Sequence, residues 1–222
     1  QKLRMQLDGP PAVAGTSVAA CEERCPLPTQ DAQSAQHSNM SKSVAPASIM
    51  TAAKSGNVDV LREWLNSGGQ ANAEDVLMVA AGHGHEQVVD LLLQRGAEIN
   101  EQSGEGAGTA LMAAAGRGWV RVVELLLRGG AELDLRASDG GTALMWAASN
   151  GHERVVEVLL RHGVDINLQN SEGGAALMSA ALEGHERVVD VLLQHRAEIN
   201  LQNDLGLTAL MYAAGFSDHS AV

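Results

Sequence analysis

Aromatic residues, cysteine and long apolar runs are all scarce in this sequence. Only five of its 222 residues are Phe, Tyr or Trp, so a core must be built from Leu, Val and Ala, which favours closely packed helices. The two cysteines, Cys21 and Cys25, lie within the first 45 residues, and their role stays open. No disulfide framework is therefore expected in the rest of the chain. No apolar run approaches the roughly 20 residues of a membrane-spanning helix, so we expect no membrane partner.

Basic residues are also in the minority. The chain has 15 Lys and Arg against 27 Asp and Glu, for a net charge of −12. Residues 1–45 hold four of each sign, so the whole acidic excess falls on the later residues. Because nucleic-acid binding needs clustered Lys and Arg, this balance argues against a nucleic-acid partner. It favours a protein partner that carries a basic patch.

Residues 1–46 are rich in Ala, Ser, Gln and Pro and poor in Leu and Val. Such a segment buries too little apolar surface to offset the entropy of ordering it, so we predict a disordered tail. The chain starts at Gln1, and N-terminal targeting is therefore not readable from it. The cytoplasm is the default compartment, because nothing in the sequence calls for an oxidising one.

From residue 47 onward the sequence repeats itself. Leu77 is followed by Leu111, Leu144, Leu177 and Leu210, at steps of 34, 33, 33 and 33 residues. Each is followed by Ala three and four positions later, which makes an apolar stripe on a short helix. A second block has Gly, then His or Trp, then Val-Val, and suits a turn and a second helix. A third block, close to Gly-Ala-Glu-Ile-Asn, begins a polar loop with hairpin chemistry.

These blocks resemble the ankyrin repeat family over roughly residues 47–216. The resemblance implies an all-α repeat solenoid of about five and a half repeats. Its helix-turn-helix units are joined by β-hairpin-like loops. The units stack because one unit cannot bury its own apolar face. We expect a monomeric array. The family's Thr-Pro-Leu-His reads Thr-Ala-Leu-Met at 142–145, so we expect looser hydrogen bonding between units. Units are expected near 47–74, 75–106, 107–139, 140–172 and 173–205, with a partial unit at 206–216 and a tail at 217–222.

The two ends of the array depart from the pattern. Glu63 stands where later units have Leu or Val, which predicts an outward polar face on the first unit. The connection between Asn72 and Leu77 lacks most of a hairpin. The sixth unit has a first helix and no second one. Either the chain is incomplete, or the stack ends in a half unit with part of its apolar face uncovered.

Patterns typical of catalytic and metal sites are incomplete. His85, His152 and His185 each precede Glu, but a zinc-protease helix needs a second His four residues on, where this chain has Val. We expect the His to serve the turn in which it recurs. The glycine-rich stretch 104–109 lacks the preceding strand and the Lys of a phosphate-binding loop. We therefore expect that the chain is not an enzyme and binds no metal and no cofactor.

The resemblance implies a protein-interaction module, a scaffold or adaptor, whose partner binds the concave groove between first helices and finger loops. Two alternatives stay open: a targeting or regulatory segment of a larger enzyme or receptor, and an array that scaffolds its own larger protein.

Candidate partner-binding residues are those that vary between units while the blocks around them do not. Trp146 occupies a position that holds Val, Ala, Ser or Tyr in other units, and Trp is enriched in binding hot spots. The alternative is that Trp146 fills space against neighbouring helices. The full set is Trp146, Arg117, Ser149, Asn150, Glu183 and Tyr212 on the helices, with Asp139, Glu172 and Asp204 on the fingers.

The resemblance also implies modification sites. Asn100, Asn167 and Asn200 each follow an acidic residue and Ile where a finger begins. In similar arrays an iron- and oxoglutarate-dependent dioxygenase hydroxylates Asn at this position. The alternative is that Asn suits the turn and bonds the local backbone.

Overall fold

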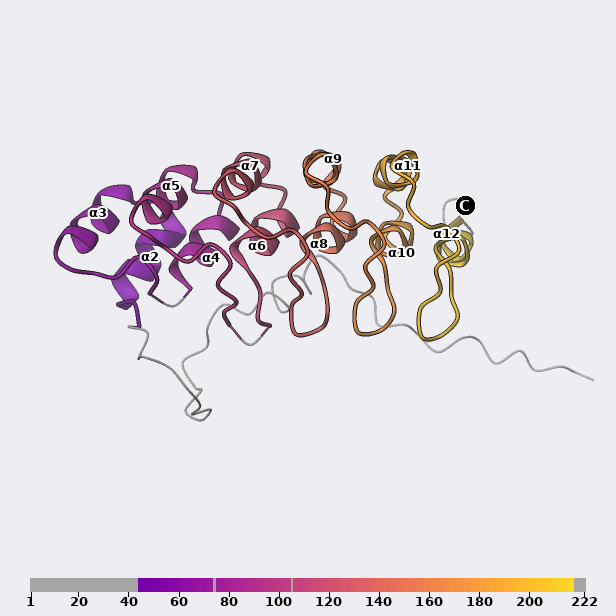
Figure 1. Cartoon of the computed structure of the whole chain (residues 1–222), viewed down its shortest axis with the longest axis horizontal. Coiled ribbons are helices and arrows are strands. Elements are labelled where there is room, and N and C mark those ends of the chain that lie inside the picture. Colours follow the sequence, from indigo (N-terminus) through magenta and orange to yellow (C-terminus); the bar gives the residue numbers. More distant parts are fainter. Residues whose placement is uncertain (1–43, 74, 105, 218–222) are drawn as a thin grey trace, which may run out of the picture.

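The structure is a computed structural model that describes residues 44–73, 75–104 and 106–217. Nearly all of the predicted N-terminal tail, both cysteines and the last five residues lie outside this part. Figure 1 shows the described chain as two rows of short helices, with loops that extend from one side. The all-helical repeat architecture predicted from the sequence is confirmed.

Each unit pairs a first helix with a second helix. The first helices are α2 (Ala47–Ser55), α4 (Val76–Gly82), α6 (Ala110–Gly116), α8 (Ala143–Ser149), α10 (Ala176–Leu182) and α12 (Ala209–Ser217). The second helices are α3 (Val58–Asn66), α5 (Glu86–Gln94), α7 (Val120–Arg128), α9 (Glu153–Arg161) and α11 (Glu186–Gln194).

The core runs along the stack between the two rows of helices. Every residue of α4 and α6 is buried, because each first helix packs against a first helix on either side and against its own second helix. The Ala pairs allow this close approach. The second helices contribute buried Val and Leu side chains, such as those of Val155 and Leu159. The predicted apolar stripes therefore meet in one continuous core.

The turn between the two helices of a unit also binds that unit to the one before it. Gly151 has a φ of 71°, and the ring of His185 lies over it, so that a Cβ added there would meet Nδ1 at 2.7 Å. His185 Nε2 lies 3.0 Å from the Ser149 carbonyl oxygen, so Nε2 carries the proton and donates it. His85 and His152 repeat this arrangement over the glycines of their preceding units.

In the third unit Trp119 takes the place of this His. Its ring lies over Gly84, and its Nε1 donates to the Gly82 carbonyl at 3.0 Å. The recurring His therefore serves the turn, as predicted, and also forms an inter-unit hydrogen bond that the sequence had not indicated.

The loops from a second helix to the next first helix, which we call fingers, span residues 95–109, 129–142, 162–175 and 195–208. Among the described residues they hold isolated β-bridges, Ser103 with Gly108 and Gln169 with Ala175, and no strand. Neighbouring fingers are joined at their tips, for example by Ser171 N donating to the Asp139 carbonyl at 2.9 Å. We expected looser inter-unit hydrogen bonding because Met replaces His at the helix start, yet turns and fingers supply such bonds throughout.

The two ends of the stack differ from its middle. Glu63 on α3 is exposed, in agreement with the predicted polar outer face. Residues 67–75 connect α3 to α4 without a finger. At the other end, Leu210 and Met211 on α12 are 67% and 54% exposed, whereas the corresponding residues of α8 and α10 are buried.

Candidate partner-binding face

The candidate residues lie within the first helices, where Trp146 and Tyr212 stand, and in two rows at the opposite ends of these helices. Arg117, Asn150 and Glu183 directly follow α6, α8 and α10, which are neighbours in the stack, and all three are half-buried. The second row is formed by the finger tips, which precede the same helices. A seven-residue helix is about 10 Å long, so a partner that contacts both rows must span at least that distance.

Trp146 is half-buried on α8. A Cβ added at Gly116 would lie 3.5 Å from Trp146 Cβ, and one added at Gly141 would lie 3.1 Å from Nε1. The indole therefore sits between the end of the preceding first helix and the base of its own finger. A fully buried Trp146 could not contact a partner, but in the structure its side chain is only half-buried.

The position of Trp146 is not equally open in every unit. Its counterparts Val79 and Ala113 are buried, while Ser179 and Tyr212 are half-buried. The Tyr212 hydroxyl accepts a 2.9 Å hydrogen bond from Asn203 Nδ2 of its own finger. Within the four units from α4 to α10 and on α12, this position is therefore partly exposed only from α8 onward, and it carries an aromatic side chain on α8 and α12, which the sequence alone had not indicated.

Two of the remaining helix-end candidates take part in hydrogen bonds within the array. Asn150 Nδ2 donates to the Trp146 carbonyl at 2.9 Å. Ser149 is half-buried, and its carbonyl accepts from His185 in the next unit. These contacts fix the backbone at the end of α8 and so hold the base of Trp146 in place.

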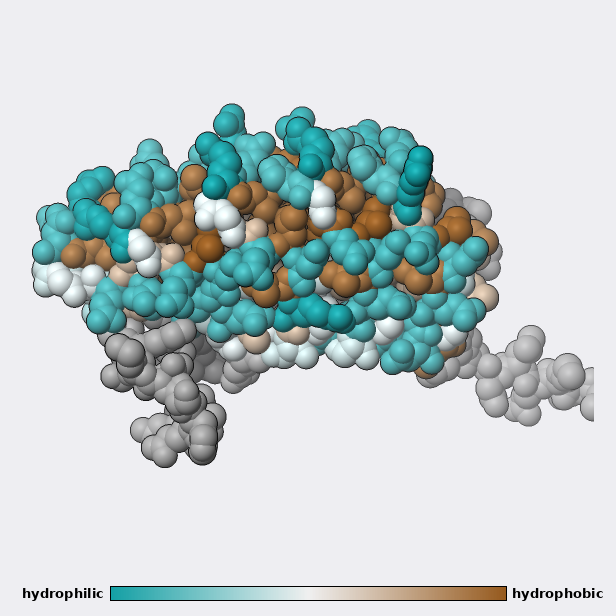
Figure 2. Space-filling view, viewed as in Figure 1, coloured by the Kyte–Doolittle hydropathy of each residue, from teal (hydrophilic) through white to brown (hydrophobic). Residues whose placement is uncertain are grey.

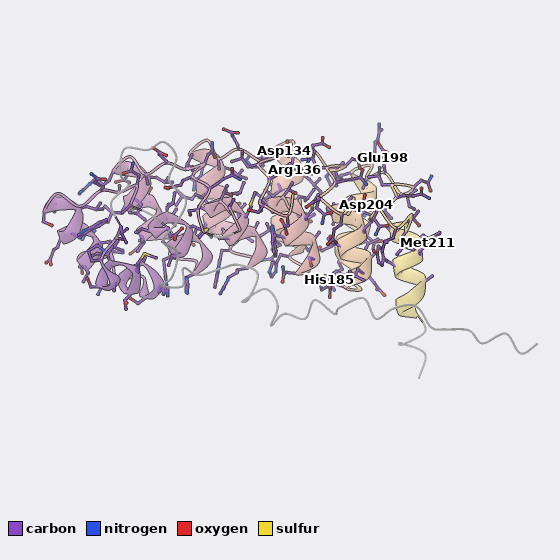
Figure 3. All side chains as sticks on the ribbon, turned by 90° about the horizontal axis from the view of Figure 1, so that it is seen from below. Asp134, Arg136, His185, Glu198, Asp204 and Met211 are labelled. Atoms are coloured by element: carbon purple, nitrogen blue, oxygen red, sulfur yellow. The ribbon has the colours of Figure 1, made fainter. Side chains whose placement is uncertain are left out.

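The finger tips carry exposed carboxylates. Asp139, Glu172 and Asp204 lie on three successive fingers, and their backbones are joined because Ser171 N donates to Asp139 and Asp204 N donates to Glu172. Asp139 Oδ1 also accepts from Gly141 N at 2.8 Å, which closes its own turn. Figure 3 shows the finger residues Asp134, Arg136 and Glu198 toward one edge, His185 toward the opposite edge, and Asp204 between them.

Among the described residues, the turn between α8 and α9 holds a histidine with a shifted pKa. Burial lowers the pKa of His152 below its usual 6.5, its hydrogen bond to the Gly116 carbonyl acts in the opposite direction, and the nearby His185 lowers it further. A lowered pKa favours the neutral ring at pH 7, with Nε2 carrying the proton that it donates to the Gly116 carbonyl.

Two of the three asparagines predicted as hydroxylation sites use their side chains in bonds between units. Asn100 Oδ1 accepts from Glu132 N at 2.9 Å, and its Nδ2 donates to the Glu132 carboxylate at 2.9 Å. Asn167 makes the same pair of bonds to Glu198. Asn200 is exposed. A recurring Asn one period before a recurring Glu was the sequence signal that could have revealed this pairing.

An apolar strip is a further surface feature that the sequence reasoning missed. Figure 2 shows it running between the second helices and the fingers. Partly buried side chains from the helix ends and finger starts that contribute apolar surface include Leu127, Leu133, Leu160 and Ile166, and Ile199 is exposed. The Ile or Leu that follows Glu or Asp in each third block was the available signal.

The described residues contain no group of three or more His, Cys, Asp or Glu side chains placed to hold a metal ion. None of their helices combines the length and the apolar character needed to cross a membrane.

Comparison with known proteins identifies the repeat. A family model described as ankyrin repeats (3 copies) matches residues 36–103, 77–170 and 158–222. No curated protein matches the chain with significant similarity. The matched segments cover most of the sequence, and the stacked helix pairs and fingers are the arrangement that such repeats require. This chain belongs to the ankyrin repeat family.

Proposed function

We propose that the array binds a protein partner along the concave side formed by the finger tips and the first helices. Ankyrin repeats are generally protein-protein interaction modules and are typically non-catalytic. The observation that carries the proposal is the half-buried Trp146 on α8, at a position where α4 and α6 hold small buried residues. A partly exposed indole on a rigid helix is an effective anchor, because it buries much area at little cost in conformational entropy.

The charge of the array supports a partner with a basic patch. Each of the last three fingers presents an exposed carboxylate at its tip, and the chain as a whole carries a net charge of −12. Such a surface speeds association with a cationic partner and suppresses acidic ones. Because exposed charges are screened by salt, affinity should fall as ionic strength rises from about 50 to 500 mM, and an affinity that is insensitive to salt would argue against a basic patch.

The test compares one variant with a matched control. A partner is first identified by affinity capture on the full chain, and its affinity is then measured for the wild type, Trp146→Ala and Gln194→Ala. Gln194 is exposed on α11, in the other helix row. We expect Trp146→Ala to lose about 2 kcal/mol of binding, roughly 30-fold, and Gln194→Ala to lose none. A loss of about 3 kcal/mol in stability with unchanged affinity would instead make Trp146 a core residue.

The array is proposed to act as a monomer, which sedimentation analysis can check. The exposed apolar side chains of Leu210 and Met211 also favour a second function class, in which the array targets or regulates a larger enzyme or receptor and α12 packs against further protein. Sequencing full-length transcripts that contain this chain distinguishes the two, because only the second class requires a catalytic or receptor domain in the same reading frame.

Asparagine hydroxylation is a separate proposal. Asn200 is its best candidate, because Asn200 is exposed whereas the amides of Asn100 and Asn167 are bonded to the next unit. Peptide mass spectrometry of native material should then show the modification first at Asn200. Finding all three sites unmodified would retire the idea.

A further inference from the structure

The α3–α4 connection is too short to form a finger. It has nine residues, 67–75, whereas the four fingers have 14 or 15. Each later finger is joined to the one before it, as when Ser138 N donates to the Gly106 carbonyl at 2.9 Å. The first finger, residues 95–109, has no predecessor. Its outer edge therefore faces the space that another finger would occupy (Figure 1).

This open edge carries backbone groups that are paired in every later finger. Glu132 N donates to the Asn100 side chain, and the Arg136 carbonyl accepts from the Gln102 side chain at 2.7 Å. The corresponding groups of the first finger are the Glu98 N–H and the Gln102 carbonyl. No described residue pairs with either of them. Unpaired backbone of this kind is a template for an added extended segment.

A small pocket that opens to solvent lies beside this edge. Its polar lining includes the carboxylates of Asp75, Glu98 and Glu101, and its apolar lining includes Leu77 and Ile99. It is far too small for a whole small-molecule ligand. Its acidic and apolar lining suits the cationic head of one side chain whose apolar stem lies along the rim.

Asp75 is the group in this pocket that lacks a partner. It is only 5% exposed, and its Oδ1 has no hydrogen-bond donor in the described structure. In the units that follow, Thr109 and Thr142 occupy this helix-start position and accept a bond from the backbone three residues on, whereas Asp75 makes no such bond. A buried carboxylate oxygen without a donor is costly, so we infer that a donor reaches Oδ1 from outside the described chain.

We propose that this pocket receives an arginine side chain from an extended basic segment of the partner, whose backbone pairs with the outer edge of the first finger. The stem of the arginine lies on Leu77 and Ile99, and the guanidinium donates to Asp75, with Glu98 and Glu101 adding negative charge. A metal ion fits less well, because no group of three or more ligating side chains is placed to hold one in the described chain. The inference rests on the proposed function, since it names the chemistry of the partner at a second place on the array.

The test uses substitutions that preserve the fold. Asn suits the φ of 66° at residue 75, so Asp75→Asn removes the charge and keeps the shape. Asp190→Asn makes the same charge change at an exposed position on α11, outside the candidate binding residues, and serves as the control. A random twelve-residue peptide library displayed on phage is selected on the full chain of the wild type and of each variant. Peptides selected by the wild type and by Asp190→Asn should share an arginine at a fixed position, and those selected by Asp75→Asn should not.

A synthetic version of the selected peptide then isolates the charge. Replacing its arginine with citrulline, which has the same shape and no charge, should weaken binding to the wild type by about tenfold or more. The same replacement should have little effect on binding to Asp75→Asn. In NMR spectra of the full chain, the peptide should shift the backbone amides of Glu98 and Ile99.

Four results would overturn the proposal. The first is that Asp75→Asn selects arginine peptides as well as the wild type does. The second is that the amide shifts map away from the first finger. The third is that no peptide is enriched on the wild type. The fourth is that replacing the basic residues of the N-terminal segment with Gln shifts the Glu98 and Ile99 amides without peptide, which would assign the pocket to the chain itself. None of these bears on Trp146, so the proposed function is tested separately. The basic residues replaced in that variant are Lys2, Arg4, Arg24 and Lys42.

Discussion

Replacing Gly151 with alanine tests whether the turn rings hold neighbouring units together. The new Cβ would lie 2.7 Å from His185 Nδ1 and 2.8 Å from Cε1, well inside normal contact distance. The ring therefore has to move, and with it the 3.0 Å hydrogen bond from His185 Nε2 to the Ser149 carbonyl. The substitution thus disturbs the contact between the two units while the recurring His185 side chain stays in the chain.

Gly184 provides the matched control. It occupies the same turn one unit later with the same φ of 71°, and no described atom lies within 4 Å of an added Cβ. In this left-handed region an alanine costs about 1–2 kcal/mol at either site, so the backbone contribution cancels in the comparison. Losing the ring hydrogen bond, with a carbonyl left unpaired, adds about 1–3 kcal/mol at Gly151 only. We expect Gly151→Ala to be the more destabilising by that amount.

Urea unfolding of both variants measures the difference, with a constant m-value as the check that the same transition is observed. The ring contact is then isolated in a His185→Ala background, where Gly151→Ala and Gly184→Ala should cost the same. If the two variants differ by less than about 0.5 kcal/mol in the presence of His185, the rings do not couple the units and the reasoning is refuted.

Three smaller predictions concern single positions. Arg196 has a φ of 66° where earlier units have Gly, so Arg196→Gly should stabilise the chain by up to about 1 kcal/mol in urea unfolding, and a loss of stability would contradict this. Thr142→Ala should lower the stability by about 1 kcal/mol, because it removes the bond from Met145 N at the start of α8. Ala175→Thr should raise the stability by a similar amount, because the start of α10 lacks such a bond. Equal stability of the wild type and both variants would contradict both predictions. The folded-state pKa of His152 lies below 6.5, so the unfolded chain binds more protons and stability should fall as pH drops below about 6.5. This fall should be smaller in His152→Gln, as urea unfolding at pH 7.5 and 5.5 can show.

The repeat period predicted the helices well because a helix is a local structure. Leu144, Ala147 and Ala148 lie on one face of any helix they form, and α8 buries all three. The exposed Glu63 followed in the same way from comparison with buried counterparts in later units. Burial of a stripe is decided by spacing within about seven residues, which the sequence displays directly.

Contacts between units were harder to predict because a period shows that a residue recurs, not what it touches. His185 bonds a carbonyl 36 residues away, and Asn100 bonds Glu132 across 32 residues. Both recurrences were visible in the sequence, but each was attributed to its own turn. The short α3–α4 connection was predicted as well, whereas the buried and unpaired Asp75 beside it depends on a gap between units that no local pattern describes.

The inter-unit bonds also change how variation between units should be interpreted. In successive units the turn rings donate to the carbonyls of Lys54, Gly82, Gly116 and Ser149, which are three residue types at one position. Because the acceptor is backbone, the array tolerates any side chain there that fits, and variation at Ser149 requires no partner to explain it. Trp146 differs, since a large, partly exposed apolar side chain has a solvation cost that packing offsets only in part. Of these two candidates on α8, Trp146 is therefore better supported as a binding residue than Ser149. Ser149→Ala should accordingly leave both stability and partner affinity within about 0.5 kcal/mol of the wild type, and a larger loss of affinity would return Ser149 to the binding surface.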